Sequence, residues 1–91
     1  MGEVVHRTAG VEAVLGELPL CAAPPEGHSR SAYRRVEVYD RTGRPWPGTV
    51  TAWWTDPEGV ELCRLRLSGA PTPRWTVFDS DRIVLLVQGG T

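Results

Sequence analysis

The sequence predicts a mainly β fold, a small five-stranded barrel preceded by a short amphipathic helix. Three observations predict it. Residues 33–87 contain five short runs rich in β-branched and aromatic residues, and Gly-, Pro- and Asp-rich turns separate them. An apolar stripe with helical spacing comes before these runs. The chain of 91 residues has room for one such domain with a small core.

One helix is predicted near the N-terminus. Its apolar residues fall at positions i, i+3, i+4 and i+7, namely Val11, Val14, Leu15 and Leu18. We expect Thr8 to cap the helix and Pro19 to stop it. Because Gly10 and Gly16 weaken so short a helix, it needs a surface on which to bury its stripe. We expect that surface to be the barrel of the same chain, over Trp53.

An extended linker is predicted to follow the helix, because residues 20–31 include a Pro pair, a Gly and two Ser. The domain organisation is therefore a helix and linker over residues 1–31, a barrel domain over residues 32–88, and a frayed tail over residues 89–91.

The five strands are predicted at residues 33–39, 49–55, 60–68, 74–78 and 83–87. Within the second run, alternation places Trp54 on the core face with Val50 and Ala52, and it places Trp53 on the opposite face. The third run breaks its alternation, so we expect a β-bulge near residues 63–64.

The loops between these runs differ in length. A long turn over residues 40–48 follows the first strand, a tight turn over residues 56–59 follows the second, and one helical turn over residues 79–82 precedes the last. This order resembles the SH3-like small barrels, which include Tudor-type and KOW-type domains. The resemblance covers residues 33–87 and rests on strand number and loop order. The chain lacks the acidic early loop and paired Tyr of peptide-binding SH3 domains, so the resemblance implies a fold and no functional residue.

Composition and the start of the chain narrow the class of protein. All ten basic residues are Arg, a usage typical of a GC-rich genome such as that of an actinobacterium, so abundant Arg is weak evidence for phosphate binding. The start of the chain has no basic and apolar leader, and no run approaches the ~18 apolar residues of a membrane helix. We therefore expect a cytoplasmic protein with no membrane contact, in which Cys21 and Cys63 are reduced thiols.

Catalytic and metal chemistry find little support in the residues. His6 lies near the terminus and His28 in the linker, so neither is on a rigid element. Cys63 is interpreted as a buried strand residue. Asp79 and Asp81 are interpreted as residues of a turn and not as a catalytic pair of carboxylates. No closely spaced Cys pair and no phosphate-binding Gly motif is present. The prediction is a protein that is not an enzyme and has no catalytic residue, no metal and no cofactor.

The candidate binding residues are aromatic and Arg side chains: Trp46, Trp53, Arg34, Arg44, Arg64 and Arg66. An outward Trp53 would stack under Arg64 and Arg66, lie under the helix, or bind a partner. Trp46 stands between two prolines and is either a lid on the core or a rigid recognition tip.

These residues predict a non-enzymatic module for protein interaction or self-association, with a protein partner or a second copy as ligand. The alternative is a nucleic-acid-binding small barrel that uses the same Arg and Trp face. The net charge of −1 disfavours the alternative, because such domains are usually basic.

Overall fold

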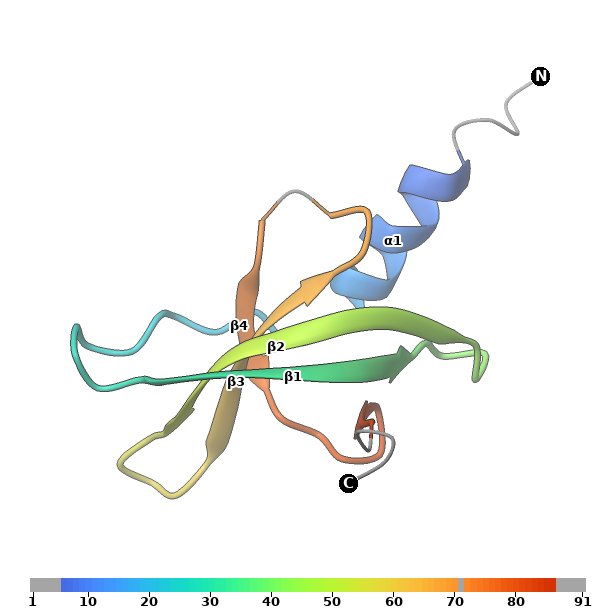
Figure 1. The fold of residues 1–91 in the computed structure, drawn as a ribbon. Helices are drawn as coiled ribbons and strands as arrows, with labels where there is room; N and C mark the ends of the chain where they lie inside the picture. Colours follow the sequence, from blue (N-terminus) through green and yellow to red (C-terminus); the bar gives the residue numbers. More distant parts are fainter. Residues whose placement is uncertain (1–5, 71, 87–91) are drawn as a thin grey trace.

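A computed structural model describes residues 6–70 and 72–86 of the chain (Figure 1). Within them lie one helix and five strands: α1 (His6–Gly16), β1 (Arg30–Tyr39), β2 (Pro45–Thr55), β3 (Glu61–Leu67), β4 (Arg74–Val77) and β5 (Ile83–Leu85). The strands form a single antiparallel sheet in the order β4-β3-β2-β1-β5. The prediction of a mainly β fold with five strands and one short helix is confirmed.

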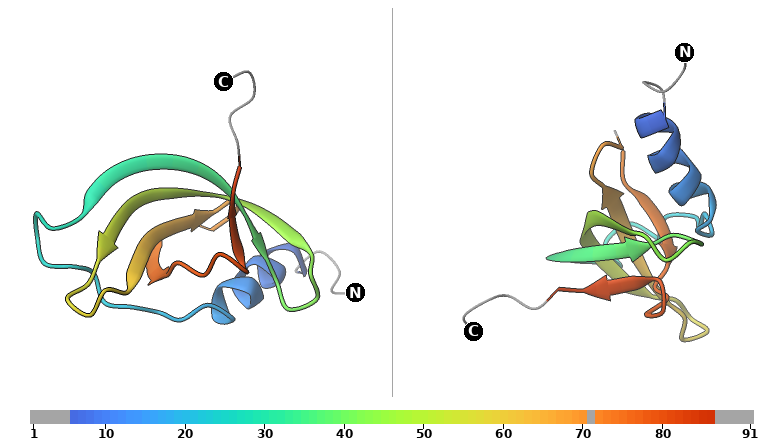
Figure 2. Two further views of the ribbon diagram at one scale, coloured as in Figure 1. Left: turned by 90° about the horizontal axis from the view of Figure 1, so that it is seen from below. Right: turned by 90° about the vertical axis from the view of Figure 1, so that its right-hand side faces the viewer.

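Over the described residues the sheet is curved but not closed into a barrel, so the predicted closed barrel is not confirmed. Figure 2 shows the strands as arches with α1 on their hollow side. In the described residues, β4 and β5 are the edges and no ladder joins them. These strands have only four and three residues. The linker also occupies part of the β4 edge, since the Cys21 N–H donates to the Trp75 carbonyl at 2.9 Å.

A bulge in β2 decides which side chains face the core. The β2–β3 register shifts between Val50 and Ala52, so Thr51 is the extra residue. The bulge predicted near residues 63–64 is wrong, because β3 alternates regularly from Cys63 to Leu67. We call the face on which α1 packs the inner face and the opposite one the outer face.

The bulge reverses the predicted facing of the two adjacent tryptophans. Trp53 lies opposite the fully buried Cys63, on the inner face, and packs against the core. Trp54 lies opposite Leu62, on the outer face. The expectation of a core Trp54 and an outward Trp53 is therefore wrong, because one extra residue shifts every following side chain to the other face.

The core forms between α1 and the inner face. Its buried members are Val11, Val14, Leu15, Leu18, Val36, Val38, Val50, Cys63, Leu65, Leu67 and Ile83. The whole predicted apolar stripe belongs to it, with Val11, Val14 and Leu15 in α1 and Leu18 just after it, so the helix docks on the sheet of its own chain. It lies against Trp46 rather than over Trp53, and a Cβ on Gly10 would come within 2.9 Å of the Trp46 ring.

The ends of several elements differ from the sequence prediction. The helix includes Thr8, so this residue is not its cap. It ends at Gly16, before Pro19, because the next two amides bond back across three residues in a tighter turn, at 3.0 and 3.1 Å. β1 begins at Arg30, so the last linker residues belong to the sheet. The predicted end of the last strand at residue 87 and the tail over residues 89–91 lie outside the described residues.

Candidate functional site

The six candidate binding residues lie at three separate places: Trp53 with Arg34, Trp46 with Arg44, and Arg64 with Arg66. Of the three alternatives expected for Trp53, stacking under Arg64 and Arg66 is wrong. Both Arg side chains are exposed on the outer face, and Trp53 faces inward. The single Arg and Trp face expected from the sequence is thus divided among different parts of the molecule.

Trp53 and Arg34 lie at a hollow in the inner face, which we call the Trp53 pocket. Its volume is about 410 Å³ and its lining is Arg30, Ala32, Arg34, Trp53, Glu61, Phe78 and Leu85. Trp53 and Phe78 meet edge to face, with ring centroids 5.1 Å apart at 68°. All five strands, or the residues next to them, contribute to the pocket, so the sheet fixes its shape.

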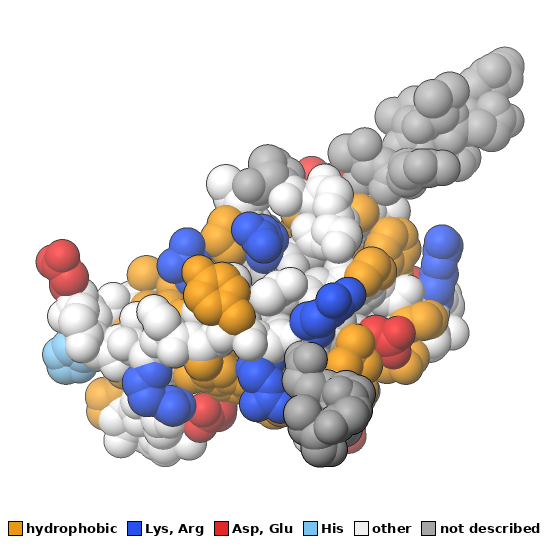
Figure 3. Space-filling view, in the orientation of Figure 1, with side chains coloured by type: hydrophobic (Ala, Val, Ile, Leu, Met, Phe, Trp, Pro, Cys, Tyr) orange, Lys and Arg blue, Asp and Glu red, His pale blue; other side chains and the backbone are white. Residues whose placement is uncertain are grey.

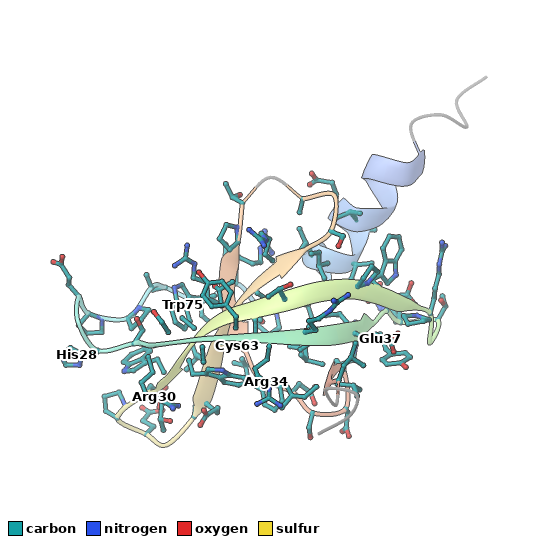
Figure 4. The ribbon with its side chains drawn as sticks, viewed as in Figure 1. His28, Arg30, Arg34, Glu37, Cys63 and Trp75 are labelled. Atoms are coloured by element: carbon teal, nitrogen blue, oxygen red, sulfur yellow. The ribbon has the colours of Figure 1, made fainter. Side chains whose placement is uncertain are left out.

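Two arginines line this pocket from one strand. Arg30 lies opposite Trp53 and Arg34 lies opposite Val50, and β-strand alternation also directs Ala32 to the inner face. Figure 4 labels Arg30 and Arg34, which project on the same side of the β1 ribbon. Arg34 was a candidate from the sequence, whereas Arg30 and Phe78 were missed. The missed signal was the even spacing of residues 30, 32 and 34.

Glu61 is the acidic member of the Trp53 pocket. Its Oε2 lies 3.7 Å from Arg30 Nη2, and its Oε1 accepts a hydrogen bond from the Thr55 hydroxyl at 2.9 Å. The Arg30 and Glu61 side chains are 67% and 41% exposed. A pair this long and this exposed contributes at most ~1 kcal/mol, so it does not hold Arg30 away from a ligand.

Trp46 lies at the other end of the inner face and acts as a lid on the core. Its Nε1 donates to Asp40 Oδ2 at 2.9 Å, and the Arg44 guanidinium carbon lies 4.8 Å from the ring centroid. Beside it is a second hollow of about 420 Å³, which includes Val11 and Pro47 in its lining. Asp40, Arg44 and the helix all contact the indole. These structural contacts are enough to explain a Trp at this position without a ligand.

Asp40 organises the turn that carries Trp46. Its Oδ1 accepts hydrogen bonds from the Thr42 hydroxyl at 2.6 Å and from the Thr42 and Arg44 amides at 2.9 and 3.0 Å. The hydrogen bond from the Thr42 hydroxyl, then that from the Trp46 indole, holds the pKa of the carboxyl well below its usual range. The sequence signal for it is an Asp two residues before Thr-Gly, in the run Asp40-Arg41-Thr42-Gly43, which is typical of an Asx turn.

The outer face carries Arg64, Arg66 and a further arginine, Arg35. Arg35 and Arg66 flank Thr49 in one cross-strand row, and Arg64 lies opposite Trp75. We call the three arginines the outer Arg patch. Figure 3 shows Arg side chains spread among hydrophobic and neutral ones over the face that it views.

The cysteine and histidine side chains of the described part form no catalytic or metal-binding cluster. Cys63 is fully buried, and its pKa is raised to about 12, first because burial disfavours the thiolate and then because of Cys21 and Glu61. His28 is exposed in the linker, and the side chain of His6 lies outside the described part. In residues 10–70 and 72–86, no three His, Cys, Asp or Glu side chains form a group that could hold a metal ion.

Comparisons with family models, with curated proteins and with solved structures found no match to this chain. Across the described residues, no helix has the length and apolar character needed to cross a membrane.

Proposed function

We propose that this protein is a non-enzymatic interaction module that binds a segment of another protein in the Trp53 pocket. The observation that carries the proposal is a hollow with a Trp53–Phe78 floor, lined on one side by Arg30 and Arg34. Trp and Arg are the side-chain types most enriched where partners bind tightly. The volume of about 410 Å³ suits one or two apolar side chains of a peptide.

The other two places support this role less well. Trp46 is engaged by Asp40, Arg44 and α1, so a ligand would have to displace these contacts. The outer Arg patch is charged, but neither of the two hollows described above includes any of its arginines.

The finer fold assignment and the compartment belong to the same proposal. The strand order, with β1 between β2 and β5, supports an SH3-like topology opened between β4 and β5. Folds of this kind host many functions, so the function rests on the pocket and not on the resemblance. The two free cysteines fit a reducing compartment such as the cytoplasm.

A pocket-filling variant tests the proposal. Ala32 lines the pocket, whereas its neighbour Ser31 faces outward opposite Ala52, so Ala32→Phe and Ser31→Phe form a matched pair. Peptides are selected on the full chain from a displayed random heptapeptide library, and folding of both variants is checked by circular dichroism. We expect selected peptides to bind Ser31→Phe as they bind the unaltered chain, and Ala32→Phe at least about tenfold more weakly. Failure to select any peptide, or equal binding by both variants, would reject the function.

Nucleic-acid binding is the second candidate, and the outer Arg patch favours it. Arg35, Arg64 and Arg66 are exposed on one face of the sheet. Anisotropy titrations with a labelled 12-nucleotide oligo(U) at two salt concentrations test it, because phosphate contacts give a steep salt dependence. Arg66→Glu should abolish such binding and Arg34→Glu should not, whereas the absence of binding at low salt removes this candidate.

A further inference from the structure

The edge of the sheet at β5 adjoins the Trp53 pocket. Two backbone hydrogen bonds fix the ladder between β1 and β5, Tyr39 N–H to the Arg82 carbonyl at 2.8 Å and Leu86 N–H to the Arg35 carbonyl at 2.9 Å. In an antiparallel ladder, bonded and non-bonded pairs alternate. The N–H and C=O of Leu85 therefore point away from β1, toward the edge of the sheet.

The same residue joins this edge to the pocket. The side chain of Leu85 lies on the inner face, opposite the buried Val36, and lines the Trp53 pocket. An extended chain that paired with Leu85 would direct every second side chain onto the inner face. One such side chain would then lie over Trp53 and Phe78.

The charges of the pocket indicate which residues of the bound segment should stand on either side of its apolar side chain. Arg30 and Arg34 lie on the inner face, and Glu61 already bonds with Thr55 and pairs with Arg30. A carboxylate two positions from the apolar side chain points the same way and comes toward these arginines. Since both guanidinium groups are exposed, this pairing adds selectivity and faster association more than affinity.

From this geometry, and resting on the proposed function, we infer that the ligand is an extended acidic segment of a partner protein. It adds to the edge of β5 as a further strand, through hydrogen bonds to Leu85. An apolar side chain enters the Trp53 pocket, and carboxylates two residues before and after it meet Arg30 and Arg34.

A second copy of this chain is a poorer occupant on charge grounds. Edge-to-edge pairing of β5 with the β5 of another copy is isologous, so it brings the two Trp53 pockets side by side. Arg30 and Arg34 of both copies would then approach one another, and like charges repel. An acidic partner has the complementary charge.

The probe that tests this inference is a capped heptapeptide, acetyl-Thr-Asp-Thr-Leu-Thr-Asp-Thr-amide, whose Asp and Leu residues share one face of a strand. The full chain is titrated and followed by nuclear magnetic resonance. We expect saturable shifts of the Leu85 amide and the Trp53 indole. Replacing both Asp residues of the peptide by Lys should weaken binding at least about tenfold. Arg34→Glu should weaken binding to a similar extent, whereas Arg66→Glu, which changes the charge equally on the outer face, should not.

Backbone methylation of the probe tests strand addition separately from charge. In a strand, successive N–H groups point to opposite sides, so only one of two adjacent amides meets Leu85. Two methylated peptides are compared, one with a methyl group on the amide nitrogen of Leu and one with it on the amide nitrogen of the following Thr. We expect one of them, set by the direction of the added strand, to bind at least about tenfold more weakly than the probe, and the other to bind about as tightly as the probe. Equal binding of the two methylated peptides would overturn strand addition.

The remaining outcomes separate this inference from the proposed function. Library peptides that lose binding in Ala32→Phe but show no preference for acidic residues would overturn the acidic segment and leave the proposed function standing. Absence of any peptide binding would reject both. A dimer in light scattering that Ala32→Phe dissociates would identify a second copy as the occupant and overturn the acidic partner.

Discussion

Trp53 lies directly opposite the buried Cys63 across the β2–β3 ladder, and the bulge at Thr51 is the reason. In an unbulged β2, the alternation of Val50 and Ala52 would continue to Trp54, as the sequence predicts. The bulge also leaves Trp53 at the end of the inner face that lies away from Trp46 and α1, where the pocket forms.

The two adjacent tryptophans should differ in their effect on stability. We expect Trp53→Ala to lower the free energy of unfolding by up to about 3–5 kcal/mol, since it removes a partly buried aromatic side chain that packs against the core and against Phe78. Trp54→Ala, on the outer face, should cost less. Urea unfolding followed by circular dichroism measures both, and the reverse order would contradict the facing that the bulge imposes.

The two helix glycines should respond in opposite directions to Ala. A Cβ on Gly16 meets nothing within 4 Å, so Gly16→Ala should raise the free energy of unfolding by up to about 1 kcal/mol through helix propensity. A Cβ on Gly10 would lie 2.9 Å from Trp46 Cη2, so the helix or the indole must shift. We expect Gly10→Ala to destabilise the chain, and thermal melts of the two variants test it. A stabilised Gly10→Ala would show that α1 does not press on Trp46.

Glu17 should stabilise the attachment of α1 to the sheet. Its Oε1 accepts from Arg82 Nη2 at 2.6 Å and from the Arg41 amide at 2.9 Å, and its side chain is only 17% exposed. We expect Glu17→Gln to lower the free energy of unfolding by about 1–3 kcal/mol. Glu12→Gln, at an exposed position of α1, is the control and should change little. Equal effects in urea unfolding would mean that the contact contributes only through net charge.

Asp40 should make stability depend on pH in the acid range. Because the pKa of Asp40 in the folded chain lies below its ordinary value of 3.8, the ionised group stabilises the fold above that pH. This stabilisation is lost as pH falls below 3.8 toward the folded-state pKa. Asp40→Asn should therefore be less stable than the unaltered chain at pH 7, and the difference should shrink at lower pH. Urea midpoints measured at several pH values test this, with the exposed Glu26→Gln as control; a constant difference would contradict it.

Residue patterns were sufficient for the local elements. The spacing of Val11, Val14, Leu15 and Leu18 predicted a helix that needs a docking surface, and these residues are buried in the core. β-branched and aromatic runs located all five strands, because such residues fit a pleated, half-buried surface. The bulge prediction was wrong because the third run breaks its alternation of apolar and polar residues without a bulge in β3. Leu62 is buried on the outer face, so apolar character did not mark the inner side.

The sequence by itself determined the class of fold, the burial of the helix stripe and the approximate position of each strand. These features depend on residues close together in the chain. Only the tertiary structure decided that the sheet stays open, that Trp53 faces inward, and that Arg30, Phe78 and Leu85 meet at one pocket. The physical reason is that register and edge pairing depend on contacts between distant segments. A single extra residue such as Thr51 shifts them without changing the local pattern.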